Sequence, residues 1–413
     1  MAHLSISPLA PKRHVNLPPI AGIDMAAVAS GERYKDRLDL WALRGVAGTQ
    51  VAGVFTKNTI PGVPVTWSKR ALTSATHDPR LVIVNAGRAN VFTGEAGETF
   101  AYETAKKAAE LLGGTAQTVL LASTGIIGQC PNIDPITAGL ETISGAMTSD
   151  GWADGAEAIR TTDTFAKLAT IETDIASVPV RINGIAKGSG MIMPDMATML
   201  AFIATDARLS QSTLQALLKE ATDSSFNSIT VDSDSSTSDT VILMASGAAG
   251  HDLIDNPSAS ELNNFKQALL ELMQDLAKQI VRDGEGATKF IEVKIEQART
   301  AEEARQFALS IANSPLVKTA MAGEDANWGR LMMAIGKTNI PLDPQKISLY
   351  FGPHCVARGG AIHPDYSEDI GATYMKNQDL KLTINLGEGE GDATIWTCDL
   401  THGYIDINAD YRS

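Results

Sequence analysis

The chain has 413 residues, of which 44% are hydrophobic and 20% are charged. That balance is typical of globular proteins and excludes an intrinsically disordered chain. Its 48 Asp and Glu residues outnumber 34 Lys and Arg residues, and the formal net charge of −14 disfavours phosphate backbones and anionic lipid surfaces. We therefore expect one large or two medium domains, with no nucleic-acid or membrane partner.

The positions of the cysteine and histidine residues indicate the cellular compartment and whether a metal site is expected. Cys130, Cys355 and Cys398 are widely spaced, which favours a reducing compartment over a disulfide framework. A secretory signal has an apolar segment that follows a basic start. We expect no such signal here, because the first residues show no apolar segment of that kind. The seven histidines are scattered and show no metal-ligand spacing. We predict a cytoplasmic protein without a metal or another cofactor.

The first half of the chain alternates predicted helices and strands. A helix over 101–114 should end at its two glycines, and a buried strand over 118–122 follows it. That strand runs into Ser123, Thr124 and Gly125, which we expect to form a loop at the strand end. Backbone N–H groups in such a loop can be aimed at a ligand, so the loop is a candidate oxyanion site.

Further elements follow the same periodicities. Helices are predicted at 136–147, 152–160, 212–222 and 259–282, and strands at 166–172, 178–186, 199–207, 347–351, 380–386 and 393–400. The strand at 199–207 is a continuous apolar run and should be central and fully buried. Glu285 follows the longest helix on a glycine-flanked turn, where its carboxylate could bind an ammonium group. The GEGEGD sequence at 387–392 is predicted to be a hairpin turn.

The most informative stretch is KGSGMIMPDMATMLAFIATDA, from Lys187 to Ala207. A threonine hydroxyl can attack the preceding carbonyl and convert the peptide bond to an ester, which water then hydrolyses. Cleavage between Ala197 and Thr198 would leave Thr198 with a free α-amine that can serve as its own base, without a histidine. By composition alone, a threonine before a strand is more often an ordinary β-branched residue.

Six motifs in order favour the catalytic interpretation. They are the 187–207 stretch, STG at 123–125, TTDT at 161–164, DGEGATK at 283–289, DANWGR at 325–330 and INADYRS at 407–413. Together they resemble the ornithine acetyltransferase (glutamate N-acetyltransferase) family over nearly the whole chain. The resemblance implies an acyltransferase of arginine biosynthesis that moves acetyl from N-acetylornithine to glutamate through Thr198.

The resemblance also implies roles for individual residues. Thr198 is the nucleophile, and Thr124 and Gly125 form the oxyanion hole. The substrate contacts that the resemblance implies are Thr161, Lys187, Thr198, Glu285, Asn408 and Ser413. Lys187 suits an α-carboxylate, and Glu285 suits the δ-ammonium of ornithine.

The implied architecture is an α/β fold, a layered α/β/β/α sandwich assembled from the cleavage products 1–197 and 198–413. A heterotetramer of two copies of each product is expected from the family. Arg88 and Phe92 depart from the family pattern, as do Ser233 and Ser238 in a polar loop, and these changes leave substrate detail open.

Three questions stay open at this point. Acetyl-CoA remains open as a second acetyl donor. A self-cleaving aminopeptidase or amidase on the same fold would release free acetate instead of acetylglutamate. A metabolite-binding protein that never cleaves would keep one intact chain.

Overall fold

The computed structural model describes residues 5–12, 15–74, 80–193 and 199–409, and the chain divides into two compact units. Unit 1 comprises Met1–Pro11, Ser228–Ser233 and Val281–Ser413. Unit 2 comprises Lys12–Asn227 and Asp234–Ile280. The described residues 80–193 and 199–227, which precede and follow the predicted Ala197–Thr198 cleavage position in the sequence, therefore belong to unit 2.

Unit 2 contains two sheets. The first has the order β1-β2-β4-β5, with strands Ile23–Val28, Leu40–Gly45, Arg80–Arg88 and Val119–Ile126. The second has the order β3-β9-β8-β7-β6, with strands Gln50–Phe55, Thr240–Ala245, Leu200–Thr205, Val178–Lys187 and Lys167–Ile175. Strand β8 lies between β9 and β7, and every one of its residues is buried, so the predicted central strand is confirmed.

Apolar side chains from both sheets form one core between them. Trp41 of β2 and Phe202 of β8 meet there edge to face, with ring centroids 5.2 Å apart. Helices α1 (Val63–Leu72) and α4 (Trp152–Ala158) add Val65 and Trp152 to the same core. The alternation of strand side chains leaves the opposite face of each sheet to be covered by other helices.

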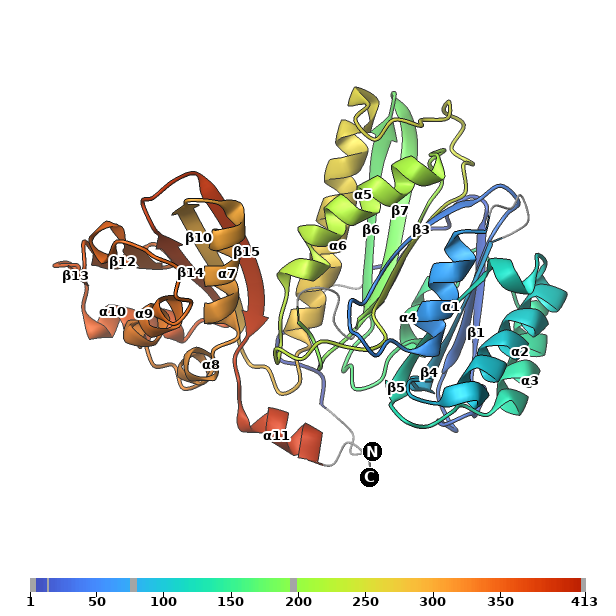
Figure 1. The fold of residues 1–413 in the computed structure, drawn as a ribbon, viewed down its shortest axis with the longest axis horizontal. Helices are drawn as coiled ribbons and strands as arrows, with labels where there is room; N and C mark the ends of the chain where they lie inside the picture. The colour runs from blue at the N-terminus through green and yellow to red at the C-terminus, as the bar shows by residue number, and fades with distance from the viewer. Residues whose placement is uncertain (1–4, 13–14, 75–79, 194–198, 410–413) are drawn as a thin grey trace. The chain divides into compact units, whose positions relative to one another are not determined.

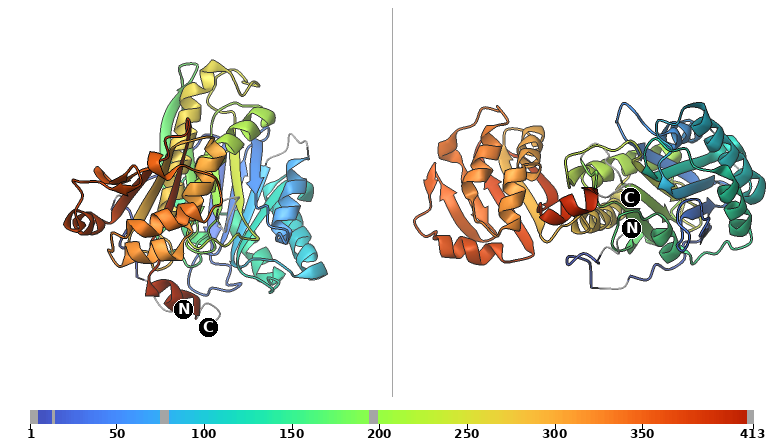
Figure 2. Two further views of the ribbon diagram at one scale, coloured as in Figure 1. Left: turned by 60° about the vertical axis from the view of Figure 1, so that its left-hand side comes forward. Right: turned by 90° about the horizontal axis from the view of Figure 1, so that it is seen from below.

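Helices cover both outer faces. On the first sheet, α2 (Gly94–Leu112) and α3 (Ile133–Ser144) bury a second apolar cluster. On the second sheet lie α5 (Gln211–Asp223) and α6 (Asn263–Arg282), and a Cβ on Gly184 of β7 would stand 2.9 Å from the Leu276 side chain. Unit 2 is therefore layered α/β/β/α, as predicted (Figures 1 and 2). The apolar stripe predicted along 259–282 is the buried face of α6.

Unit 1 is built on a six-stranded sheet of order β13-β12-β11-β14-β10-β15. In chain order from β10 to β15 its strands are Phe290–Ala298, Ser348–Phe351, His354–Arg358, Ala361–Ile362, Asp379–Asn385 and Gly391–Cys398. Its helices are α7 (Ala301–Ala312), α8 (Pro315–Ala322), α9 (Trp328–Gly336), α10 (Glu368–Met375) and α11 (His402–Ala409). Phe307 of α7 and Phe351 of β11 belong to its buried core.

The hairpin predicted at 387–392 is wrong. Strand β10 lies between β14 and β15, parallel to β14 and antiparallel to β15. The turn therefore crosses over the end of β10 instead of joining two paired strands. Periodicity identified both flanking strands, but it carries no information about a third strand placed between them. None of the helices in the described part of the chain combines the length and apolar character that a membrane crossing requires.

Candidate active site

Thr124 lies within β5, so the loop predicted at 123–125 is wrong. Strand β5 continues because its parallel partner β4 continues, with Thr124 opposite Ala86 and Gly125 opposite Gly87. Gly125 has φ +129°, and a Cβ there would stand 2.3 Å from the Gly87 carbonyl carbon. No side chain fits at that approach, so only glycine allows the strand to finish in this way.

The Thr124 hydroxyl accepts a hydrogen bond from Lys187. Lys187 is the last residue of β7, and its Nζ lies 3.1 Å from Thr124 Oγ1, so the bond joins the two sheets of unit 2. Thr124 and Lys187 are 1% and 2% exposed. An ammonium nitrogen has no lone pair with which to accept a hydrogen bond, so Lys187 must be the donor. The Thr124 hydroxyl hydrogen is not used in this bond and can be donated to another partner.

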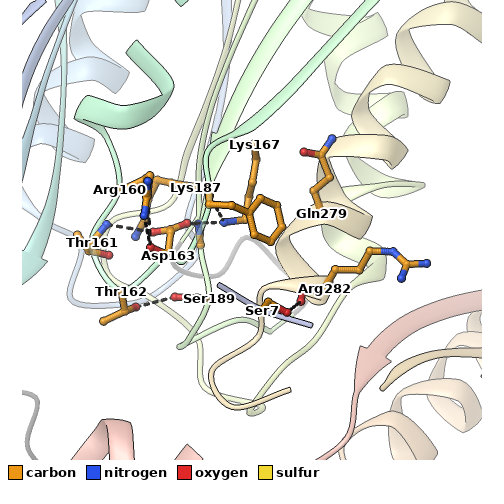
Figure 3. Close-up of polar contacts among 12 residues, drawn as sticks. Ser7, Arg160, Thr161, Thr162, Asp163, Lys167, Lys187, Ser189, Gln279 and Arg282 are labelled. Carbon is orange, nitrogen blue, oxygen red and sulfur yellow. Dashed lines mark hydrogen bonds and ion pairs between the residues drawn. The ribbon is translucent and has the colours of Figure 1, made fainter. Parts of the chain in front are cut away.

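The Asp163 carboxylate accepts hydrogen bonds from three segments of the chain, at Thr161, Lys167 and Gly188. Its Oδ1 accepts from Lys167 Nζ and from the N–H of Gly188, each at 2.7 Å. Its Oδ2 accepts from the N–H of Thr161 at 3.0 Å. Figure 3 shows the carboxylate between Thr161 and Lys167, with Lys187 alongside. One carboxylate therefore holds the TTDT turn, the start of β6 and the residue that follows Lys187.

Asp163 stays ionised inside the protein. Burial opposes its ionisation, but the charges of Lys167 and Lys187 outweigh that cost and hold the pKa of Asp163 below its ordinary value. Both side chains of the Asp163–Lys167 ion pair are fully buried. A pair of this kind adds little net stability, but removing one partner leaves a buried charge and is costly.

The second group of predicted residues belongs to unit 1. Glu285 is 9% exposed, and its Oε2 accepts a hydrogen bond from Asn408 Nδ2 at 2.7 Å. Asn408 lies on α11, so part of the predicted C-terminal tail is helical and contacts the predicted carboxylate. The structure therefore brings together Glu285 with Asn408, and separately Lys187 with Thr124.

Local contacts fix the turn that carries Glu285. Asp399 Oδ1 accepts from the N–H groups of Thr288 and Lys289 at 2.8 and 3.0 Å. Thr401 Oγ1 donates to the carbonyl of Gly286 at 2.7 Å. A Cβ on Gly286, which has φ +75°, would stand 2.5 Å from the backbone nitrogen of Tyr404. The turn therefore packs directly on the first residues of α11.

Three predicted site residues, Ala197, Thr198 and Ser413, lie outside the described residues. Met199, which follows Thr198 in the sequence, is described, and its N–H donates to Asp239 Oδ1 at 2.9 Å. The sequence patterns predicted no role for Asp163, which lies in the TTDT motif, or for Asp239. Asp163 and Lys167 are four residues apart, a spacing that pairs side chains only on a helix. Because Lys167 begins strand β6, no local pattern in the sequence indicated this ion pair.

Residues 24–413 match the model of the ArgJ family. The chain belongs to the ArgJ family. It is 50% identical over 410 residues to the arginine biosynthesis bifunctional protein ArgJ of Gluconobacter oxydans, which covers 99% of this chain and 96% of that protein. The protein of the same name from Mesorhizobium japonicum is 48% identical over 417 residues, with 99% of each chain covered.

Two solved structures are also similar to part of this chain. ArgJ from Bacillus halodurans is 41% identical, covers 49% of this chain and 95% of its own, and has a TM-score of 0.48. Ornithine acetyltransferase from Mycobacterium tuberculosis, complexed with ornithine, is 30% identical, covers 42% and 92%, and has a TM-score of 0.36. The family model and the two relatives of similar length confirm the predicted family, and with it the predicted class of activity, an acetyltransferase of arginine biosynthesis.

Two departures from the family pattern have distinct environments in this ArgJ member. Arg88, at the end of β4, forms an ion pair with Glu32, whose side chain is only 2% exposed. Phe92 is 81% exposed and has φ +55°, a conformation that bulky residues rarely adopt. Arg88 therefore has a structural partner, and nothing in the structure explains the conformation of Phe92.

Proposed function

We propose that this protein transfers acetyl from N-acetylornithine to glutamate through an acetyl ester on Thr198, giving ornithine and N-acetylglutamate. Membership of the ArgJ family supports the reaction. The observation that carries the catalytic assignment is the hydrogen bond from Lys187 to Thr124. It leaves the threonine hydroxyl with a hydrogen to donate to negative charge that develops on the acetyl oxygen.

The nucleophile arises by self-cleavage. Breaking the Ala197–Thr198 bond gives chains 1–197 and 198–413 and frees the α-amine of Thr198. The α-amine of a free chain terminus ordinarily has a pKa of about 8. The freed amine can therefore take the hydroxyl proton as the threonine attacks the acetyl group. The acetyl ester then passes its acyl group to the amine of glutamate.

Thr124 and Gly125 form the oxyanion hole in this proposal. Burial of Thr124 supports the assignment, because a donor that is shielded from water stabilises an oxyanion more strongly than an exposed one. Lys187 strengthens that donor, since an ammonium that donates to a hydroxyl oxygen polarises its O–H bond. Loss of one donor of this kind typically costs about 10²–10³ in kcat.

Substrate recognition uses charge complementarity. The Lys187 ammonium has three donor hydrogens, so it can bind Thr124 and the α-carboxylate of an acylated amino acid together. Glu285 provides a carboxylate for the δ-ammonium of ornithine, and Asn408 already orients one of its oxygens. Thr161 and Ser413 complete the contacts with neutral hydrogen bonds.

Product analysis and intact mass test the proposal together. The wild-type protein should separate into 1–197 and 198–413, whereas Thr198→Ala should remain a single chain. With N-acetylornithine and glutamate, the wild type should form acetylglutamate and ornithine in equal amounts. Free acetate as the main product would instead identify a hydrolase, and an uncut, inactive wild type would identify a binding protein.

Two finer parts of the proposal need their own measurements. Light scattering after size exclusion should give the mass of two copies of each cleavage product. Replacing N-acetylornithine by acetyl-CoA in the same assay decides whether the enzyme accepts a second donor, because formation of acetylglutamate then requires the thioester.

A further inference from the structure

Lys167 is a buried ammonium that the chemistry above does not use. It is the first residue of β6, and its side chain is fully buried. Its Nζ lies 2.7 Å from Asp163 Oδ1 and 3.4 Å from the carbonyl oxygen of Phe165, and it stands 4.8 Å from the centroid of the Phe165 ring. Buried charges are stable only when they are paired, so Lys167 and Asp163 depend on each other.

Two lysines approach Asp163 from neighbouring strands. Strands β6 and β7 are adjacent in the second sheet, and Lys167 of β6 stands opposite Ala186 of β7 (Figure 1). Lys187 follows Ala186, so the side chains of the two lysines leave opposite faces of the sheet. Figure 3 shows the Asp163 carboxylate beside Lys167, with Lys187 alongside. The carboxylate therefore has an ammonium group on each side of the sheet near it.

The backbone contact to Gly188 limits the distance between Asp163 and Lys187. The N–H of Gly188 donates to Asp163 Oδ1 at 2.7 Å. Two covalent bonds, of about 1.3 and 1.5 Å, join that nitrogen to Lys187 Cα, so the oxygen lies within about 6 Å of this Cα. A lysine has a flexible four-carbon stem, so the Lys187 ammonium can reach the carboxylate as well as Thr124. In the structure it donates to Thr124 at 3.1 Å, while the carboxylate pairs with Lys167.

The charge on Lys167 determines the field that acts on Lys187. Burial opposes the ionisation of Asp163, but the charges of Lys167 and Lys187 hold its pKa below its ordinary value. The carboxylate is therefore charged, and with Lys167 it forms a pair that has no net charge. Without Lys167 it would be a full negative charge beside Lys187. Opposite charges attract strongly where water is excluded, so the carboxylate would then draw the Lys187 ammonium to itself.

Building on the substrate recognition in the proposed function, we propose that Lys167 is a positioning residue for Lys187. By neutralising Asp163, it leaves the Lys187 ammonium on Thr124. There the ammonium can also bind the α-carboxylate of the acyl donor. Lys167 touches no substrate in this arrangement, and it acts on recognition only through the carboxylate with which it pairs. Its loss should therefore reduce selectivity for donors that carry an α-carboxylate.

Lys167→Met tests the inference with two acyl donors, N-acetylornithine and N-acetylornithinamide. The second donor keeps the acetyl group and the δ-ammonium but has a neutral carboxamide in place of the α-carboxylate. In the wild type, kcat/KM should favour N-acetylornithine by about 10- to 100-fold, as for a hydrogen bond to a charged group. Lys167→Met should reduce this preference at least about tenfold. A purely structural defect would lower kcat/KM for both donors equally and leave the preference unchanged.

Three further variants separate charge from packing. Lys167→Met combined with Asp163→Asn removes the attracting carboxylate, and its preference should return to within about threefold of the wild-type value. Lys167→Arg keeps the positive charge and should keep the preference. Lys318→Met removes another buried ammonium, which donates to Thr397 in unit 1, and should leave the preference at the wild-type value.

The kinetic outcomes distinguish this inference from the proposed function. An unchanged preference in Lys167→Met overturns the inference and leaves the proposed function standing. A preference that is lost in Lys167→Met but not restored by adding Asp163→Asn also overturns it, because the charge of Asp163 is then not the cause. A wild type that uses both donors equally overturns carboxylate recognition by Lys187, and the inference with it, but not acetyl transfer. A wild type that forms no acetylglutamate overturns the proposed function.

A crystal structure decides the case in which Lys167→Met has no measurable activity. The substitution is then made in the single-chain Thr198→Ala background, so the result does not depend on self-cleavage. The Lys187 Nζ should lie within hydrogen-bond distance of the Asp163 carboxylate, and an ammonium still on Thr124 would overturn the inference. If Lys167→Met does not fold, Lys167→Gln takes its place, because the amide still donates to the carboxylate but carries no charge.

Discussion

Lys187 and Thr124 form a buried hydrogen bond that links β7 of one sheet to β5 of the other, with Nζ and Oγ1 3.1 Å apart. The two residues are 63 positions apart in the sequence. Because the Thr124 oxygen accepts from Lys187, the bond restricts the directions in which the Thr124 hydroxyl can donate its own hydrogen. It therefore relates the stacking of the two sheets directly to the proposed oxyanion hole.

Lys187→Met should lower kcat for acetyl transfer by about 10²–10³, because the Thr124 hydroxyl loses the ammonium that polarises it. Lys318→Met is the matched control. Lys318 is also buried, and its Nζ donates to Thr397 Oγ1 at 3.0 Å within unit 1. That variant should lower the thermal midpoint without changing kcat of the folded protein. Equal kcat values for both variants would contradict a special role for Lys187.

Asp163→Asn, made in the single-chain Thr198→Ala background, should lower the free energy of unfolding by about 3–5 kcal/mol. The reason is that Lys167 loses its ion pair within a fully buried site. Adding Lys167→Met should recover much of that loss, because no ammonium is then buried there. Urea unfolding measures both, and a double variant no more stable than Asp163→Asn would count against the buried-charge explanation.

The same variant has a predictable pH dependence. The folded pKa of Asp163 lies below the unfolded value of about 3.9, so its stabilising contribution is complete above about pH 5. It is lost only as the pH falls below the unfolded pKa and through the folded one. The stability gap between Thr198→Ala and its Asp163→Asn derivative should stay constant from pH 8 to pH 5 and narrow below pH 4. A gap that widens in acid would contradict the direction of the shift.

Gly125→Ala should prevent β5 from closing onto β4, since the new Cβ would stand 2.3 Å from the Gly87 carbonyl group. Gly128→Ala separates this clash from backbone strain. Gly128 also has a positive φ, +84°, but no atom lies within 4 Å of its added Cβ. We expect Gly128→Ala to cost about 1–2 kcal/mol, and Gly125→Ala to lose soluble protein or acetyl transfer. Similar yields and rates for the two would show that β4 can move aside.

Glu285→Gln should distinguish donors with and without a δ-ammonium. The amide can still accept from Asn408, so the turn is retained, but the negative charge is lost. We expect kcat/KM for N-acetylornithine to fall about 10- to 100-fold, as for loss of a hydrogen bond to a charged group. N-acetylnorvaline, which lacks the ammonium, should be used as before. Equal losses for both donors would place Glu285 in a structural role.

Local sequence patterns determined much of the fold. Apolar spacing located α6, and a continuous apolar run identified β8 as a buried central strand. Both patterns depend only on residues within a few positions of one another, so they can be recognised without knowledge of the tertiary structure. The motif order likewise sufficed for the family, and the resemblance implied Thr124, Lys187, Glu285 and Asn408 as candidate site residues.

The tertiary structure decided which of these residues meet. Glu285 and Asn408 are 123 positions apart and make a hydrogen bond, and Asp163 contacts residues from three segments. Strand β5 extends through Thr124 because β4 runs beside it, and β10 separates the two strands predicted as a hairpin. Strand pairing and sheet stacking depend on chain segments that are distant in sequence. A local pattern states which face of an element is apolar, but only the packed structure determines what that face meets.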